Sequence, residues 1–100
     1  MKTTINEVDG KLLVALVGEL DTAAAAGVEQ ELQPLYENED KDIVFDCEKL
    51  EYIASSGLRI LLSILKKAKS HGHTVTLKSM NDDIKNVFKM TGFINLFNFE

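Results

Sequence analysis

Cysteine is nearly absent from this sequence, because Cys47 is the only one among 100 residues. One cysteine cannot form a disulfide within the chain, so a reducing compartment is the simpler expectation. Cys47 follows a short apolar run and has no neighbour in the sequence that would activate its thiol. We therefore expect it to be a small residue close to the core.

Long apolar runs are absent as well. No segment approaches the roughly 18 consecutive apolar residues that a membrane-spanning helix requires. The first residues, Met1–Glu7, carry an acidic side chain where a secretory signal peptide needs its apolar centre. The sequence therefore predicts a cytoplasmic protein that does not insert directly into a membrane.

Positive charge is scarce and dispersed. The chain has 11 lysines and arginines against 16 aspartates and glutamates, which gives a formal net charge of −5. Apart from Lys66, Lys67 and Lys69 the basic residues are scattered, whereas a nucleic-acid-binding protein needs a concentrated basic face. The sequence therefore argues against nucleic acid as a partner and favours other proteins.

The residues that are present predict one α/β domain over residues 1–100. The length suits a single domain, and 45% hydrophobic residues is ordinary for a globular core. Apolar patterning predicts strands over residues 2–8, 12–17, 43–45 and 74–78, with Asp9-Gly10 as a hairpin turn. Helical spacing predicts three helices, which start near residues 22, 56 and 82. The order β-β-α-β-α-β-α implies a mixed, mostly parallel sheet with helices packed on it.

Some features of these elements depend on packing. Pro34 removes a backbone donor, so the first helix should kink or end there. In the second helix, over residues 56–70, Ile60 and Ile64 widen the apolar stripe, either because they face a partner or because they pack on the C-terminal segment. The tail 93–97 is too apolar to extend into water and should pack back on the domain.

The stretch Ser55-Ser56-Gly57 lies at the start of the second helix. Serine favours a helix N-cap because its hydroxyl accepts a hydrogen bond from an unpaired N–H of the first turn. The same free N–H groups and the helix dipole also suit a phosphate. A serine at this place is therefore either a plain cap or a covalent switch, and one serine is enough for a cap.

The sequence places no catalytic partner residues beside these serines. A serine hydrolase would need a base beside Ser55 or Ser56, but the only histidines, His71 and His73, lie beyond the far end of the helix, roughly 20 Å away. These histidines and Cys47 make a weak pattern for a metal, and no phosphate-binding glycine loop is present. The sequence predicts a protein that is not an enzyme and holds no metal or cofactor.

Four separated segments share their order and spacing with a known family. They are Gly18-Glu19-Leu20-Asp21, the run 43–46 followed by 50–53, Ser55-Ser56-Gly57-Leu58, and Thr91-Gly92-Phe93 with Leu96-Phe97. In this combination the chain resembles, over essentially all of its 100 residues, the STAS domain of bacterial anti-sigma-factor antagonists.

The resemblance implies a function in partner switching. In that family the unphosphorylated antagonist binds an anti-sigma factor, which is also a serine kinase, and so releases the sigma factor. The kinase phosphorylates a serine at the start of the second helix, and a metal-dependent serine phosphatase reverses the modification. The matching residue here is Ser55, with Ser56 as the adjacent alternative.

We expect the partner to contact Asp21, Ser55, Ser56, Gly57 and Arg59. The resemblance places Asp21 near the phosphorylation site, while its sequence context alone favours an ordinary N-cap. Gly57 either lets a partner's backbone approach or permits tight packing of the helix on the sheet. Arg59 lies four residues after Ser55 and either pairs with a phosphate there or is a solvated surface arginine.

Ala54 separates two functional interpretations. The family often has an aspartate immediately before the phosphorylated serine, and this chain has alanine. The first interpretation is an antagonist that is switched by phosphorylation at Ser55. The second is a constitutive STAS interaction module, for example an accessory subunit of a membrane transport complex. A small enzyme or a nucleotide-binding domain is a third class.

Overall fold

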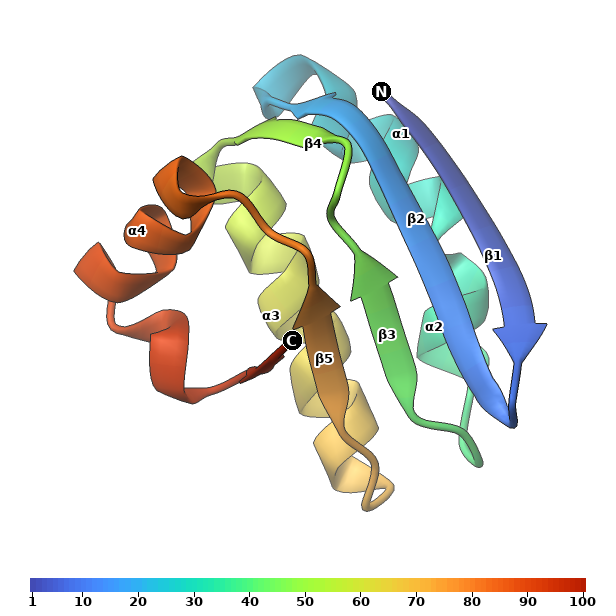
Figure 1. Cartoon of the computed structure of the whole chain (residues 1–100). Coiled ribbons are helices and arrows are strands. Elements are labelled where there is room, and N and C mark those ends of the chain that lie inside the picture. Colours follow the sequence, from blue (N-terminus) through green and yellow to red (C-terminus); the bar gives the residue numbers. More distant parts are fainter.

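A six-stranded mixed sheet forms the centre of the fold (Figure 1). The structure is a computed structural model that describes all 100 residues. The elements in chain order are β1 (Lys2–Val8), β2 (Lys11–Leu20), α1 (Thr22–Glu31), α2 (Gln33–Glu37), β3 (Ile43–Asp46), β4 (Leu50–Ile53), α3 (Ser55–Ser70), β5 (Val75–Lys78), α4 (Asp82–Met90), the 3-10 helix η1 (Phe93–Asn95) and β6 (Asn98–Phe99). β1 pairs antiparallel with β2, and every other strand pairing is parallel. The predicted α/β class with a mostly parallel sheet is confirmed.

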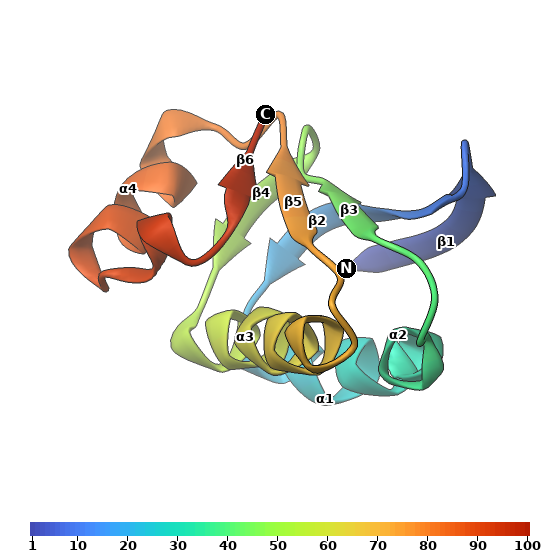
Figure 2. The same ribbon diagram turned by 90° about the horizontal axis from the view of Figure 1, so that it is seen from below.

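The helices are distributed unevenly over the sheet. α1, α2 and α3 cover one face, and no helix covers the opposite face (Figure 2). α4 and η1 lie beside the edge that β5 and β6 form (Figure 1). The core comprises 24 buried apolar residues, most of them between the sheet and the three helices. None of the helices is long and apolar enough to cross a membrane.

The opening hairpin forms as predicted. Val8 pairs with Lys11 across the two-residue turn Asp9-Gly10, whose φ angles are 53° and 77°. Left-handed backbone at both central residues is what a type I′ turn requires, and aspartate followed by glycine is a favoured pair for it. The turn therefore sets the register of β1 against β2.

The first helical region is divided into two helices at Pro34. α1 ends at Glu31, and the buried Leu32 connects it to α2, with Pro34 in the first turn of α2. Proline is tolerated there because its missing N–H would be unpaired in any case. The prediction that the helix kinks or ends at this residue is confirmed.

The predicted order lacks β4, the division into α1 and α2, and the short elements η1 and β6. β4 escapes pattern analysis because its two buried residues, Leu50 and Ile53, lie at its ends, so apolar and polar residues do not alternate. β2 extends to Leu20, beyond the predicted end at Val17, because its last residues pair with β4. The register shifts between Gly18 and Glu19, where β2 passes from β3 to β4.

The wide apolar stripe of α3 serves the interior. Ile60 and Ile64 are 5% and 0% exposed, so the interpretation that they face a partner is wrong. They are buried because α3 packs against α1 and α2 as well as on the sheet. The C-terminal segment, the neighbour that the other interpretation named, borders α3 at Leu65.

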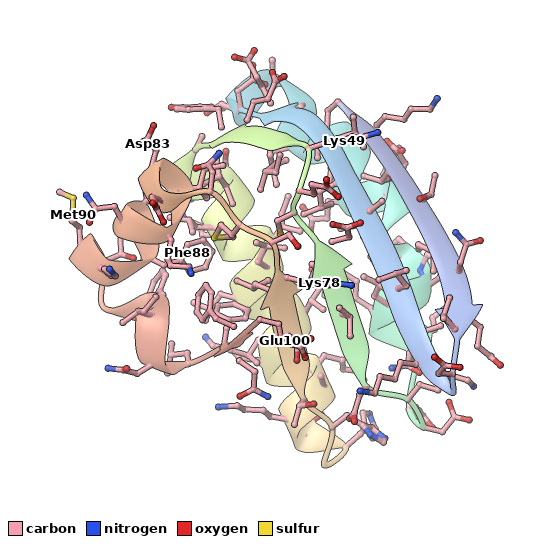
Figure 3. The ribbon with its side chains drawn as sticks, in the orientation of Figure 1. Lys49, Lys78, Asp83, Phe88, Met90 and Glu100 are labelled. Atoms are coloured by element: carbon pink, nitrogen blue, oxygen red, sulfur yellow. The ribbon has the colours of Figure 1, made fainter.

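The apolar tail packs back on the domain, as predicted. Phe97 is 6% exposed and contacts the fully buried Phe88 of α4 edge to face, with 5.6 Å between ring centroids. Phe88 also meets Phe99 of β6 at 5.8 Å. Figure 3 shows Phe88 pointing from α4 toward the last segment of the chain. These rings hold α4 and the tail together.

Candidate functional site

Ser55 is the first residue of α3 and is exposed. The N-cap of this helix is Ala54, and no side chain caps its first turn. The interpretation of these serines as N-caps is therefore wrong. The hydroxyl of Ser55 makes no hydrogen bond within the molecule, and the N–H groups of the first turn have no partner inside the helix. The position thus combines an accessible hydroxyl with unpaired backbone donors.

Ser56 has a different environment from its neighbour. It is half-buried, and its hydroxyl donates to Thr22 Oγ1 at 3.4 Å, across the contact between α3 and α1. The backbone N–H of Ala54 donates to the carbonyl of Leu20 at 2.9 Å. The starts of α1 and α3 therefore lie side by side. No signal in the sequence links Thr22 to Ser56, because the contact joins residues far apart in the chain.

Asp21 caps α1. Its Oδ1 accepts a hydrogen bond from the backbone N–H of Ala24 at 2.9 Å, which confirms the N-cap interpretation. Since Leu20 binds Ala54 and Thr22 binds Ser56, Asp21 also lies in the segment that adjoins the two serines. The carboxylate is half-buried and belongs to the same surface as Ser55.

Gly57 is buried against the sheet. A Cβ at this position would lie 2.7 Å from Cγ of Leu20 and 3.0 Å from Cγ1 of Ile53. Real Cβ atoms do not approach so closely, so only glycine lets α3 begin this near to β2 and β4. The contacts support tight packing, one of the two interpretations of this residue.

Arg59 lies on a shallow groove of about 340 Å³ between α1 and α3. The groove is lined by Thr22, Ala25, Ala26, Glu29, Ser56, Arg59, Ile60 and Ser63. Arg59 is exposed and takes part in none of the ion pairs of the molecule. A cationic side chain without a partner thus lies one helical turn from Ser55.

Tyr52 is an exposed aromatic residue close to this surface that pattern analysis missed. It lies in β4 opposite Glu19 of β2, and 51% of its surface is exposed. A prediction of the short strand β4 would have identified it, because this strand turns Tyr52 outward between the buried Leu50 and Ile53.

The remaining reactive side chains lie away from Ser55. His73 binds Asp42 Oδ1 through Nδ1 at 3.2 Å and the carbonyl of Glu39 through Nε2 at 2.9 Å, in the loops beyond the C-terminal end of α3. The helix α3, which separates His73 from Ser55, has 16 residues and is therefore about 24 Å long. Cys47 is fully buried, and desolvation raises the pKa of its thiol to about 12. The prediction of a near-core cysteine is confirmed.

The start of α3 is thus an exposed surface on a small α/β domain. The hydroxyl of Ser55 is exposed, no histidine lies beside it, and the only hollow nearby is the open groove between α1 and α3. A family model described as the STAS domain matches residues 2–100. The chain belongs to the STAS domain family, which confirms the resemblance drawn from the four sequence segments.

Similar proteins are named as anti-sigma factor antagonists. One from Bordetella bronchiseptica, described as such and designated BtrV, is 31% identical over 97 residues, which cover 97% of this chain and 84% of the relative. The anti-sigma-B factor antagonist of Staphylococcus aureus is 28% identical over 83 residues, 83% of this chain and 77% of the relative. Among solved structures, the phosphorylated form of the Bacillus cell fate determinant SpoIIAA is 18% identical with a TM-score of 0.75, over 99% of this chain and 91% of that one. This last likeness shows the shared fold.

Proposed function

We propose that this chain is a cytoplasmic anti-sigma-factor antagonist that is switched by phosphorylation of Ser55. In its unphosphorylated state it binds an anti-sigma factor, which is also the serine kinase, and so regulates transcription indirectly. Phosphorylation of Ser55 ends the binding, and a serine phosphatase restores it. The single observation that carries this proposal is that Ser55 is exposed, free of hydrogen bonds and placed at an uncapped helix start.

The differing environments of the two serines support Ser55 over Ser56. A kinase must reach the hydroxyl from solvent, and Ser55 is exposed whereas Ser56 is half-buried. The hydroxyl of Ser56 is also engaged with Thr22. Ser55 is therefore the better substrate.

A phosphate at Ser55 is compatible with the fold. It adds roughly −1.5 to −2 charge and three strong acceptors beside the N-terminus of α3, where the dipole and free N–H groups favour an anion. Ala54 contributes no competing carboxylate at the N-cap position. Because the fold tolerates the charge, the larger effect falls on a docked partner, where an unmatched phosphate must be desolvated at a cost of several kcal/mol.

Neighbouring residues take different parts in this scheme. Asp21 and Arg59 lie at the partner surface beside Ser55, and Arg59 offers a cation to the phosphate after modification. Gly57 contributes through packing, since it allows α3 to begin close to the sheet. Ser56 ties the start of α3 to α1 and so keeps Ser55 in place.

Phosphosite mapping on protein purified from its own host, with phosphatase inhibited, is the first test. We expect phosphate on Ser55 and an anti-sigma factor that co-purifies with the unphosphorylated form. Ser55→Asp should weaken binding to that factor by at least about tenfold, or about 1.4 kcal/mol. The melting temperature should barely change, because an acidic residue suits a helix N-terminus.

Ser70→Asp is the matched control, because it adds the same charge at the far end of the same helix. It should leave the affinity for the anti-sigma factor unchanged. Absence of phosphate on Ser55 across growth and stress conditions, despite complete peptide coverage, would contradict the switch. A loss of folding stability in Ser55→Asp as large as the loss of binding would instead assign Ser55 a structural role.

The presence of Ala54 favours a second candidate function, a constitutive interaction module such as an accessory subunit of a membrane transport complex. The family often has an aspartate at this position, and a kinase that recognises that aspartate would use Ser55 less well in this chain. Affinity purification from the host separates the two functions. Recovery of transporter subunits with no kinase, from cells in which Ser55 carries no phosphate, would favour the constitutive module.

A further inference from the structure

Tyr52 is the only exposed aromatic residue of the chain. It lies in β4, and it precedes Ser55, the first residue of α3, by three positions. Half of its surface is open to solvent, so the ring contributes little to the core. Tyrosine is enriched at the centres of protein interfaces, because its large, rigid ring gives much contact area for little lost conformational entropy.

Two carboxylates adjoin Tyr52 within the sheet. Glu19 of β2 lies opposite it, and Glu51 precedes it in β4. The strand register shifts between Gly18 and Glu19, so that β4 has one more residue than β2 at this place. Both glutamates are exposed, and Tyr52 is therefore an apolar ring beside negative charges.

The start of α4 lies beside β4 and adds two further carboxylates. Asn81, the N-cap of α4, donates from Nδ2 to the carbonyl of Leu50 at 3.3 Å. The next residues, Asp82 and Asp83, are exposed in the first turn of α4, and Figure 3 shows Asp83 pointing outward. We name the exposed residues of this region the β4–α4 surface; they are Glu19, Glu51, Tyr52, Asp82 and Asp83.

The carboxylates of the β4–α4 surface have no ion-pair partner within the molecule. None of them takes part in an ion pair, although the chain contains 11 lysines and arginines. Lys85 of α4 lies over the ring of Phe99 instead, 5.8 Å from its centroid. A basic partner is therefore attracted to this surface, whereas an acidic partner is repelled.

A partner that covers Ser55 also reaches Tyr52. A specific interface occupies about 800 Å² on each protein, which corresponds to a patch roughly 32 Å across. Three residues of extended chain span at most about 11 Å, so both residues fit within one such patch. Figure 1 shows that the end of β4 and the starts of α3 and α4 lie at the same end of the molecule. The β4–α4 surface is thus continuous with the surface around Ser55.

We propose that Tyr52 is the aromatic anchor of the interface with the anti-sigma factor, which presents to it an apolar recess bordered by lysine or arginine side chains. This inference rests on the proposed function. The ring fills the recess, and the surrounding carboxylates pair with the basic border and speed association.

Isothermal titration calorimetry of the full, unphosphorylated chain with the purified anti-sigma factor of the same host tests the anchor. Tyr52→Ala should weaken the affinity at least about 30-fold, the loss that a central aromatic residue causes. Tyr52→Phe keeps the ring and should bind within about threefold of the wild type. Both variants should keep the melting temperature, because the side chain is exposed. Met90→Ala, which removes an 81% exposed side chain elsewhere on α4, should bind like the wild type.

Stopped-flow measurement of the association rate tests the charge. The rate for the wild type should fall at least about tenfold between about 50 mM and about 500 mM salt. The double variant Glu19→Gln/Glu51→Gln should associate more slowly at low salt and depend less on salt. Asp9→Asn removes a carboxylate from the hairpin turn at the opposite end of β2 and should associate like the wild type.

The outcomes separate this inference from the proposed function. If the anti-sigma factor binds the wild type and Tyr52→Ala equally well, the anchor is overturned while the phosphorylation switch stands. Equal losses of affinity in Tyr52→Ala and Met90→Ala would also overturn the anchor, as would an association rate that does not depend on salt. If the wild type binds no anti-sigma factor, the proposed function fails and this inference fails with it.

Discussion

Adjacent residues at the start of α3 have separate roles because the helix turns each one toward a different neighbour. Ser55 faces solvent, Ser56 binds Thr22 of α1, and Gly57 lies against the sheet. About 100° of helix rotation per residue is enough to distribute three short side chains over three environments. The contacts of Ser56 and Gly57 therefore hold the accessible hydroxyl of Ser55 in place.

Replacement of Gly57 tests this arrangement at the scale of one methyl group. Gly57→Ala places a carbon 2.7 Å from Leu20 Cγ, so the helix start must shift or neighbouring side chains must leave their rotamers. We expect the free energy of unfolding to fall by about 1–3 kcal/mol, measured by urea denaturation.

Gly27→Ala is the control for that substitution. Gly27 is also helical, but an added Cβ meets no atom within 4 Å. This variant should be unchanged or more stable by up to about 1 kcal/mol, because alanine favours the helix. If both variants had the same stability, the close approach of α3 to the sheet would not constrain residue 57.

At the scale of elements, helix position depends on a few large contacts. α3 is buried on a broad side because it packs on the sheet and against α1 and α2. α4 lies beside the sheet edge, and its attachment to β6 rests on aromatic rings. The site at the start of α3 thus belongs to the layered part of the fold, whereas α4 depends on the C-terminal tail.

Phe88→Ala tests how α4 is attached. The ring is fully buried and meets Phe97 and Phe99 edge to face, so its removal leaves a cavity between α4 and the tail. The free energy of unfolding should fall by about 3–5 kcal/mol. Met90→Ala, in the same helix but 81% exposed, should change it by less than about 0.5 kcal/mol. Similar losses in the two variants would show that the tail does not hold α4.

At the scale of the whole molecule, the end opposite the candidate site is closed by a cluster of loops. Asp42 Oδ1 accepts hydrogen bonds from the backbone N–H of Thr74 at 2.9 Å and is 3.2 Å from Nδ1 of His73. The Thr74 N–H bond is the main reason that the pKa of Asp42 lies below its ordinary value, and His73 lowers the pKa further. The interaction joins the loop before β3 to the loop before β5.

A lowered pKa in the folded state has a defined consequence for acid stability. The carboxylate of Asp42 stabilises the fold above the ordinary aspartate pKa of about 3.9, and this contribution is lost as the pH falls through the lower folded pKa. Asp42→Asn should therefore be less stable than the wild type near neutral pH, with the difference shrinking below about pH 4. Urea denaturation at several pH values measures this.

Asp9→Asn is the control for the pH series. Asp9 lies exposed in the hairpin turn, where asparagine is equally favoured. Its stability should follow that of the wild type at every pH. A constant difference between Asp42→Asn and the wild type across the acid range would show that the charge of Asp42 contributes nothing to the loop cluster.

The sequence alone was sufficient for those features that depend on local rules. The hairpin at Asp9-Gly10, the N-cap at Asp21 and the division at Pro34 follow from backbone preferences of single residues or pairs. The mostly parallel sheet follows from the order of strands and helices. The start of α3, predicted near residue 56 and observed at Ser55, and the family were likewise accessible from short motifs at fixed spacing.

Only the tertiary structure decided what each residue of the site does. Serine is a common cap, but at this helix start the N-cap position belongs to Ala54, no side chain caps the first turn, and the hydroxyl of Ser55 is free. The bond from Ser56 to Thr22, the packing of Gly57 on Leu20 and the strand β4 all join segments far apart in the chain. Local sequence fixes backbone preference, whereas exposure and contacts arise only when distant segments pack together, so they could not be read from the sequence.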